Sequence, residues 1–169
     1  ADEAFMDVAP QASLVPQATL PGFIVLRSLG KFFGLAGARV GFVFSGTDLR
    51  LALEKELGPW AVSGPAQQLA TQALADTAWQ EMARTQLAAA SERLARLLDE
   101  CGFKPAGGTA LFQWAPTPQA RSLHETFARH GILTRLFTDP TGLRFGLPGV
   151  EAEWQRLEAA LTAARRAVA

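Results

Sequence analysis

Apolar residues in the first third of the chain form two short runs and one amphipathic stretch. Residues 23–28 and 39–44 are rich in β-branched and aromatic residues and are bounded by glycine, which is typical of strands buried in an α/β sheet. Residues 48–57 have the spacing of a helix, with Thr47 or Asp48 as its N-cap and a glycine-proline pair at its end. The pattern therefore predicts strand, turn, strand and helix, in this order.

Helical and strand-like patterns alternate through the rest of the chain. Residues 66–100 carry Ala, Leu, Gln, Glu and Arg at helical spacing, which predicts a long helix that is interrupted near Asp76 and ended by Gly102. Further strands are expected at 110–115, 132–137 and 143–147, and further helices at about 118–130 and at the end of the chain, where Trp154, Leu157, Leu161, Ala164 and Val168 share one face. This order predicts an α/β fold in 1–100 and a small α+β domain in 101–169.

Charge and composition narrow the kinds of partner that the chain can have. It carries 16 basic and 16 acidic residues, so it has no net positive field that would attract nucleic acid or an anionic membrane. No apolar run is long enough to span a bilayer, and a cytoplasmic location is expected. The two histidines have no cysteine or acidic cluster beside them, so no metal site is predicted. The single Cys101 is expected to pack at a helix end.

One of the three lysines, Lys31, stands in a setting that a solvated lysine does not need. It closely follows the apolar run 23–28 and lies among four glycines, in a strongly apolar neighbourhood. Desolvation disfavours the charged form of a lysine, and a neutral amine can form a Schiff base with a carbonyl. Ser28 and Arg39 supply a hydroxyl and a guanidinium that suit a phosphate. The alternative is a strand–turn–strand in which the lysine is incidental.

The sequence S-L-G-K-F-F-G-L-A-G-A-R-V-G at positions 28–41 resembles the active-site lysine motif of fold-type I pyridoxal-phosphate enzymes, in the aminotransferase class I/II branch. The resemblance implies that Lys31 holds pyridoxal 5'-phosphate as a Schiff base, and that Ser28 and Arg39 bind the phosphate of this cofactor. It also implies an α/β fold in which the end of a large cofactor-binding domain is followed by a small α+β domain.

A second stretch, D-E-A-F at positions 2–5, is similar to the family's D-E-A-Y. The resemblance implies that Asp2 pairs with the pyridine nitrogen of the cofactor, which keeps the ring able to accept electrons. Phe5 stands where the family has a tyrosine bonded to the ring oxygen, so that hydrogen bond must be absent or come from elsewhere. The acidic pair of Asp2 and Glu3 has no obvious partner nearby in the sequence.

Three further residues are candidates for binding the substrate. L-R-F-G-L-P at 143–148 resembles the family's final strand, which implies that Arg144 binds the substrate carboxylate. Arg135 is also an arginine among apolar strand residues, and it either lies at the substrate or pairs with an acid such as Asp139. Trp60 either lines the substrate pocket or fills the core.

The resemblance covers nearly the whole chain, but only as the C-terminal half of such an enzyme. We therefore expect the N-terminal half of the same protein to complete the site, and the resemblance implies a homodimer when the protein is complete. Together with D-E-A-F and G-I-L-T-R, the sequence P-W-A-V-S at 59–63 looks most like the threonine-phosphate decarboxylases of cobalamin biosynthesis.

That narrower resemblance implies a substrate that is a phosphorylated amino acid. The reaction would convert L-threonine O-3-phosphate into (R)-1-aminopropan-2-ol O-phosphate. The first alternative is a class I/II aminotransferase such as histidinol-phosphate aminotransferase, which uses the same residues to break a different bond. The second alternative is a non-catalytic α+β module in which the motif is inherited but idle.

Overall fold

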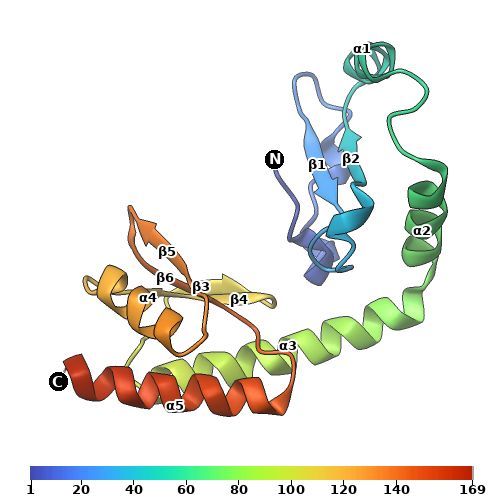
Figure 1. Ribbon diagram of the computed structural model, residues 1–169. Coiled ribbons are helices and arrows are strands. Elements are labelled where there is room, and N and C mark those ends of the chain that lie inside the picture. Colours follow the sequence, from blue (N-terminus) through green and yellow to red (C-terminus); the bar gives the residue numbers. More distant parts are fainter. Residues whose placement is uncertain (169) are drawn as a thin grey trace. The chain divides into compact units, whose positions relative to one another are not determined.

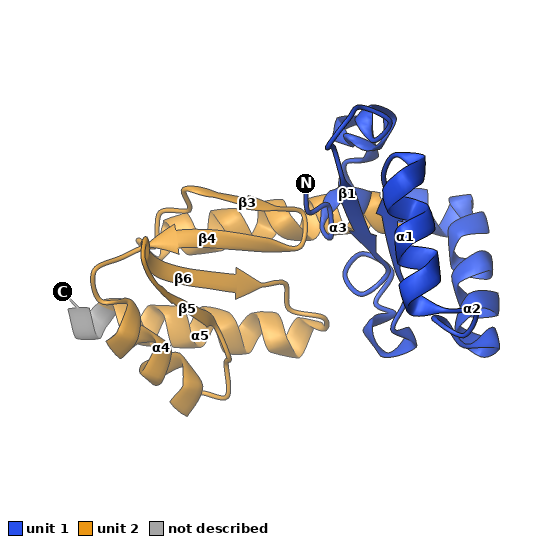
Figure 2. Ribbon diagram, turned by 90° about the horizontal axis from the view of Figure 1, so that it is seen from above, with its two compact units in different colours: residues 1–82 blue, residues 83–169 orange. Residues whose placement is uncertain are grey.

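The computed structural model of the protein describes residues 1–168, with side chains described as far as Arg165. The predicted inward position of Val168 therefore lies outside the described side chains. The chain divides into two compact units, Ala1–Met82 and Ala83–Ala169 (Figure 1, Figure 2). The division falls within one long helix, whose later turns pack into the core of unit 2. The predicted boundary after residue 100 concerns the domains of a longer protein and stays a prediction.

Unit 1 is built around a pair of short antiparallel strands. Its elements are the 3₁₀ turns η1 (Met6–Val8), η2 (Pro10–Ala12), η3 (Val15–Gln17) and η4 (Ala36–Ala38), strands β1 (Val25–Ser28) and β2 (Gly41–Phe44), and helices α1 (Thr47–Leu57) and α2 (Gly64–Ala75). Strand β1 pairs with β2 from Val25 opposite Phe44 to Ser28 opposite Gly41. A parallel bridge also joins Asp2 to Leu26, so both edges of β1 are bonded.

The two faces of this strand pair differ in burial. Val25, Arg27, Phe42 and Phe44 alternate onto one face, and of these Val25 is fully buried. On the other face Leu26 and Val43 are each 44% exposed. The prediction that both strands are buried is therefore wrong for this chain, because no layer formed by the described residues covers the second face.

The ends of the helices in unit 1 differ in how they are capped. Ser63 accepts a hydrogen bond from the amide of Ala66 and caps α2, whereas α1 starts after Gly46 without a side-chain cap, contrary to the predicted role of Thr47 or Asp48. Gly58 ends α1 with a positive φ of 68°, a backbone conformation that favours glycine. Asp76 separates α2 from α3 (Thr77–Glu100), which confirms the predicted interruption.

Unit 2 combines an antiparallel sheet with helices. Its elements after α3 are β3 (Gly107–Thr109), β4 (Phe112–Pro116), α4 (Ala120–Arg129), β5 (Arg135–Thr138), β6 (Thr141–Gly146) and α5 (Glu151–Val168). The described strands follow the order β3-β4-β6-β5, and each neighbouring pair is antiparallel. The short, glycine-rich β3 was not predicted, and the other three strands lie within a few residues of their predicted positions. No helix of residues 1–168 is both long and apolar enough to cross a membrane.

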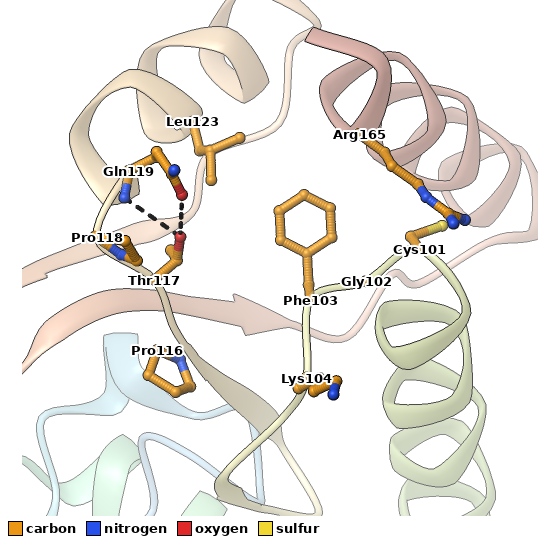
Figure 3. Close-up of a pocket in the computed structure, with 10 residues that line it drawn as sticks. All are labelled: Cys101, Gly102, Phe103, Lys104, Pro116, Thr117, Pro118, Gln119, Leu123 and Arg165. Carbon is orange, nitrogen blue, oxygen red and sulfur yellow. Dashed lines mark hydrogen bonds between the residues drawn. The ribbon is translucent and has the colours of Figure 1, made fainter. Parts of the chain in front are cut away.

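The loop after α3 lines a pocket of about 460 Å³ in unit 2 (Figure 3). Phe103 lies at this pocket and packs against Phe127 and Phe145, with ring centroids 5.9 and 6.3 Å away. Cys101 lines the same pocket and packs against the core, as predicted, and partial burial raises the pKa of its thiol. None of the predicted site residues lines this pocket.

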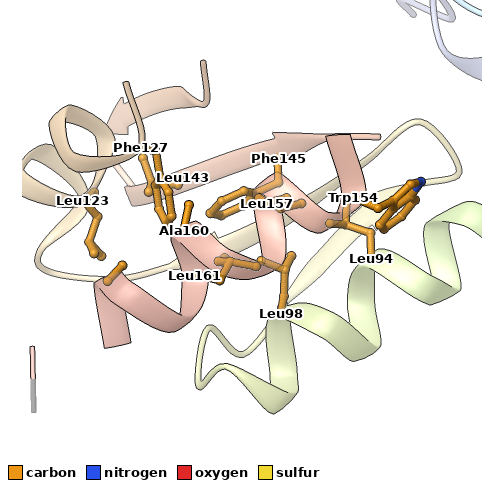
Figure 4. Close-up of a cluster of buried hydrophobic side chains, with 13 residues drawn as sticks. Leu94, Leu98, Leu123, Phe127, Leu143, Phe145, Trp154, Leu157, Ala160 and Leu161 are labelled. Carbon is orange, nitrogen blue, oxygen red and sulfur yellow. The ribbon is translucent and has the colours of Figure 1, made fainter. Parts of the chain in front are cut away.

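Unit 2 has a continuous apolar core of its own (Figure 4). Helices α3, α4 and α5 contribute side chains that meet those of strands β4 and β6. The buried members are Leu94, Leu98, Ala115, Ala120, Leu123, Phe127, Leu143, Phe145, Trp154, Leu157, Ala160, Leu161 and Ala164. The predicted inward face of the last helix is therefore confirmed at its four described positions.

Close packing against β6 leaves no room for a side chain at Gly142. A Cβ atom at this position would lie 2.4 Å from the ring of Trp114 and 2.7 Å from the carbonyl oxygen of Ala115. We expect Gly142→Ala to lower the free energy of unfolding of unit 2 by about 1–3 kcal/mol, because the indole packs against the ring of Phe137 and the carbonyl belongs to the paired strand β4, so neither can move away freely. Urea unfolding followed by tryptophan fluorescence measures this change.

Gly146→Ala on the same strand is the matched control. A Cβ atom there meets no described atom within 4 Å, so this change should alter the free energy of unfolding by less than about 0.5 kcal/mol. Equal losses in the two variants would show that the contact with Trp114 does not limit this position.

Candidate functional site

The turn that follows β1 holds Lys31 at its surface. Leu29, the first residue after β1, is buried, and its carbonyl accepts a hydrogen bond from the amide of Leu35 over 3.0 Å. Phe32 and Phe33, which directly follow Lys31, are also buried and pack against Trp79, with ring centroids 5.4 and 5.9 Å away. The apolar neighbours of the lysine thus anchor the turn in the interior, while Lys31 itself is exposed.

Lys31 lies over the ring of Phe5, with Nζ 5.5 Å from the ring centroid. This cation–π contact links the lysine turn to the D-E-A-F segment, which the sequence motif placed in the same site. The predicted desolvation of Lys31 is not observed, because the described residues leave its side chain open to solvent. Any desolvation must therefore come from a bound molecule or from another segment.

The two predicted phosphate ligands flank the lysine turn. Ser28 is the last residue of β1, and its hydroxyl accepts a hydrogen bond from the amide of Gly30 over 3.0 Å. Arg39 precedes β2 and has a left-handed backbone conformation, with φ of 55°, which costs an L-residue about 1–2 kcal/mol. Its guanidinium is exposed and donates to the carbonyl of Ala36 over 3.0 Å. Position 39 thus carries an arginine in a backbone conformation that only a glycine would adopt without strain.

Asp2 forms the parallel bridge to Leu26 of β1, the strand that leads into the lysine turn. The amide of Glu3 donates to the carbonyl of Leu26 over 2.8 Å, and the amide of Leu26 donates to the carbonyl of Ala1 over 2.9 Å. The Asp2 carboxylate is exposed and accepts a hydrogen bond from the amide of Ala4 over 3.0 Å. The structure therefore places Asp2, Phe5, Ser28 and Lys31 on adjoining segments of unit 1.

Sequence reasoning missed the charged cluster behind these residues. Glu3 and Asp7 are only 2% and 7% exposed, and both form ion pairs with Arg27 of β1. Glu3 also accepts hydrogen bonds from the hydroxyl of Ser13 over 2.7 Å and from the amide of Leu14. Two features of the sequence could have indicated the cluster. One is Glu3 in the acidic pair without an obvious partner, and the other is Arg27 within a strand that was predicted to be buried.

The two predicted substrate arginines are direct neighbours in unit 2. Arg135 of β5 lies opposite Arg144 of β6, so both side chains leave the same face of the sheet. Arg144 is half-buried over the ring of Phe112, 4.6 Å from its centroid, and burial together with the charge of Arg135 lowers its pKa. The ion pairs of the described residues do not join Arg135 to Asp139 or either arginine to any acid. Two adjoining guanidinium groups are suited to bind an anion.

Trp60 does not fill the core of this chain. Its side chain is 90% exposed in the turn after α1, so the core alternative is wrong for the described structure. Near this turn, β2 and α1 line a groove of about 600 Å³, with Val43, Leu53 and Leu57 among its apolar residues. Among the residues that the structure describes, no group of three or more His, Cys, Asp or Glu side chains could hold a metal ion.

Comparisons with known proteins define the class to which the chain belongs. Residues 1–164 match the family model described as aminotransferase class I and II, and the chain is a member of this family. The histidinol-phosphate aminotransferase of Sinorhizobium meliloti, solved in complex with pyridoxal-5'-phosphate, has a TM-score of 0.86 and 26% sequence identity. The match covers 99% of this chain and 48% of that one, and it confirms the predicted fold class.

The most informative sequence relatives belong to one kind of enzyme. The threonine-phosphate decarboxylase of Pseudomonas aeruginosa is 54% identical over 160 residues, which are 95% of this chain and 48% of that protein. The threonine-phosphate decarboxylase of a Sinorhizobium species is 42% identical over 165 residues, again 95% of this chain and 48% of that protein. The chain therefore spans about half the length of the curated relatives that it matches.

Proposed function

We propose that this chain is the lysine-bearing half of a pyridoxal-phosphate-dependent threonine-phosphate decarboxylase. The observation that carries the proposal is the exposed Lys31 over Phe5, in a turn flanked by Ser28 and Arg39. The choice of reaction rests on the two decarboxylase relatives, which match 95% of the chain at 54% and 42% identity. The proposed reaction is the decarboxylation of L-threonine O-3-phosphate to (R)-1-aminopropan-2-ol O-phosphate in cobalamin biosynthesis.

The residues of unit 1 carry groups of the kinds that the cofactor would need. Lys31 has an exposed amine that can reach an aldehyde, and the Ser28 hydroxyl and Arg39 guanidinium can donate to a phosphate. Asp2 is exposed on the neighbouring segment, where its carboxylate can hold a proton on a pyridine nitrogen. When bound, pyridoxal phosphate supplies an electron sink for the pair left on Cα after carbon dioxide departs.

The protein residues then have separate tasks. Lys31 binds the cofactor and returns a proton to Cα, and Asp2 keeps the ring nitrogen protonated. Arg144 binds the substrate carboxylate and sets its direction, and Arg135 beside it adds a second positive charge for a substrate with two anionic groups. Trp60 is proposed to line the substrate pocket of the complete protein, since its ring is exposed.

The partner that this unit needs is, in our proposal, the N-terminal half of the same protein. Ile24, Leu26 and Val43 expose an apolar surface on the β1–β2 pair, and such a surface is normally covered in a soluble protein. Further strands from the other half would cover this surface and supply the second wall of the cofactor site. We also propose a homodimer and a cytoplasmic location for the complete protein, with no nucleic acid or membrane partner.

A histidinol-phosphate aminotransferase is the main alternative, since the structural relative from S. meliloti bears that name. It would use Lys31, Asp2 and Arg144 in the same places but break the Cα–H bond instead of the bond to the carboxylate. A non-catalytic module is the third possibility. Release of carbon dioxide from L-threonine O-3-phosphate supports the decarboxylase, and product that depends on an added keto acid supports the aminotransferase.

Borohydride reduction of the cofactor-loaded, full-length protein tests the lysine assignment. We expect the reduced cofactor on Lys31 and not on Lys55 or Lys104, because Lys31 is the lysine that lies beside Ser28 and Phe5. Peptide mapping by mass spectrometry locates the label. Lys31→Ala should fold normally, since the side chain is exposed, but should take up no label. A label on Lys55 or Lys104 would contradict the proposal, and a wild-type protein that binds no cofactor would favour the idle module.

Phe5 gives a second prediction, because its ring already lies beside Lys31. In the full-length protein, Phe5→Tyr should add a hydrogen-bond donor at the ring oxygen of the cofactor and stabilise the anionic form of that oxygen. The absorption spectrum of the bound cofactor should then titrate at a lower pH than in the wild type. Phe5→Leu is the control without a donor. An unchanged titration for Phe5→Tyr would show that this side chain does not face the cofactor.

A further inference from the structure

The cluster of Glu3, Asp7 and Arg27 lies behind the lysine site and has no part in the chemistry proposed above. The two carboxylates are almost fully buried, and the Arg27 side chain is 19% exposed. Arg27 Nη1 lies 3.7 Å from Glu3 Oε2, and Nη2 of the same guanidinium forms an ion pair with Asp7 Oδ1. One guanidinium is therefore shared by two acids.

The cluster is balanced by hydrogen bonds as well as by charge. A buried carboxylate is costly unless donors surround it, and Glu3 has the Ser13 hydroxyl, the Leu14 amide and Arg27. Arg27 Nη1 also lies 3.5 Å from the Ser13 hydroxyl oxygen. The guanidinium can serve both acids because its donors form a planar fork, whereas a lysine is a single point charge on a flexible stem.

The members of the cluster are close in sequence to the residues of the lysine site. Glu3 and Asp7 enclose Phe5 in sequence, and Glu3 follows Asp2 directly. Arg27 directly precedes Ser28 on β1. Its ion pairs therefore tie the segment that carries Asp2 and Phe5 to the strand that leads into Lys31. The backbone bonds between Glu3 and Leu26 act in the same direction.

We propose that Arg27 is a positioning residue for the lysine site, which holds the Asp2–Phe5 segment against β1 through its ion pairs with Glu3 and Asp7. This inference rests on the proposed function, because it concerns the placement of groups around the cofactor. Arg27 itself does not touch the reacting atoms. Its loss should displace Asp2 and Phe5 without changing the backbone of the turn that carries Lys31.

Amide hydrogen exchange in the cofactor-free, full-length protein tests the structural half of the inference. Arg27→Lys keeps the positive charge but loses the planar set of guanidinium donors, and Arg27→Met removes the charge and the donors. We expect exchange at the amides of Glu3 and Leu26 to become at least about tenfold faster in each variant, because hydrogen bonds to charged groups contribute that much. The Gly34 amide, which bonds to Lys31 within the turn, should be unchanged.

The cofactor dissociation constant, measured by titration in the same variants, tests the functional half. It should rise by about tenfold with Arg27→Lys and further with Arg27→Met. Arg93→Met is the control, since it breaks the exposed pair of Arg93 and Glu151 and should move neither measurement.

Two outcomes would overturn the inference. One is unchanged exchange at Glu3 and Leu26, and the other is faster exchange with unchanged cofactor affinity. If Arg27→Met does not fold, Arg27→Lys decides the matter alone. A wild-type protein without cofactor affinity would instead overturn the proposed function, and the exchange rates would still show whether Arg27 holds the segment.

Discussion

The candidate site depends on one structural constraint, which is that β1 is bonded along both of its edges. Strand β2 pairs with it on one side, and the segment around Asp2 bridges to it on the other. Ser28 ends β1 and Lys31 lies in the turn that follows, so a shift of this strand would displace both. Residues that are far apart in the sequence thus surround one short strand.

The two units differ in how much of their apolar surface they bury. Unit 2 buries residues of three helices and two strands in a continuous core, and the sheet of this unit carries the arginine pair. Unit 1 buries Val25, Leu29 and the two phenylalanines beside Lys31, but leaves Leu26 and Val43 open. A site that uses an open sheet face is suited to completion by another segment, and this is why we assign the other wall of the site to the N-terminal half.

Local signals in the sequence predicted most of the secondary structure. Gly58 and Gly102 mark helix ends because both have a positive φ there, and Asp76 marks the break between two helices. The lysine motif could be found because its residues are close in sequence. Strand β3 was missed, since Gly107–Thr109 is too short and too rich in glycine to show an alternating pattern.

Features that depend on distant contacts could not be predicted in the same way. Arg27 binds Asp7 across 20 positions, and no spacing rule links these residues. The exposure of Lys31 depends on which segments cover the turn, and neighbouring residues in the sequence do not determine that. The directly opposed Arg135 and Arg144 follow from the register of β5 and β6, which only the structure provides.

The central claim is that this chain holds the lysine wall of a cofactor site that another segment must complete. Titration of pyridoxal phosphate into the isolated 169-residue chain and into the full-length protein, followed by absorption, tests it most directly. We expect stoichiometric binding to the full-length protein, lost with Lys31→Ala, and weak or no binding to the isolated chain. Binding of equal affinity by the isolated chain as a monomer would contradict the claim, because the site would then be complete without the second wall.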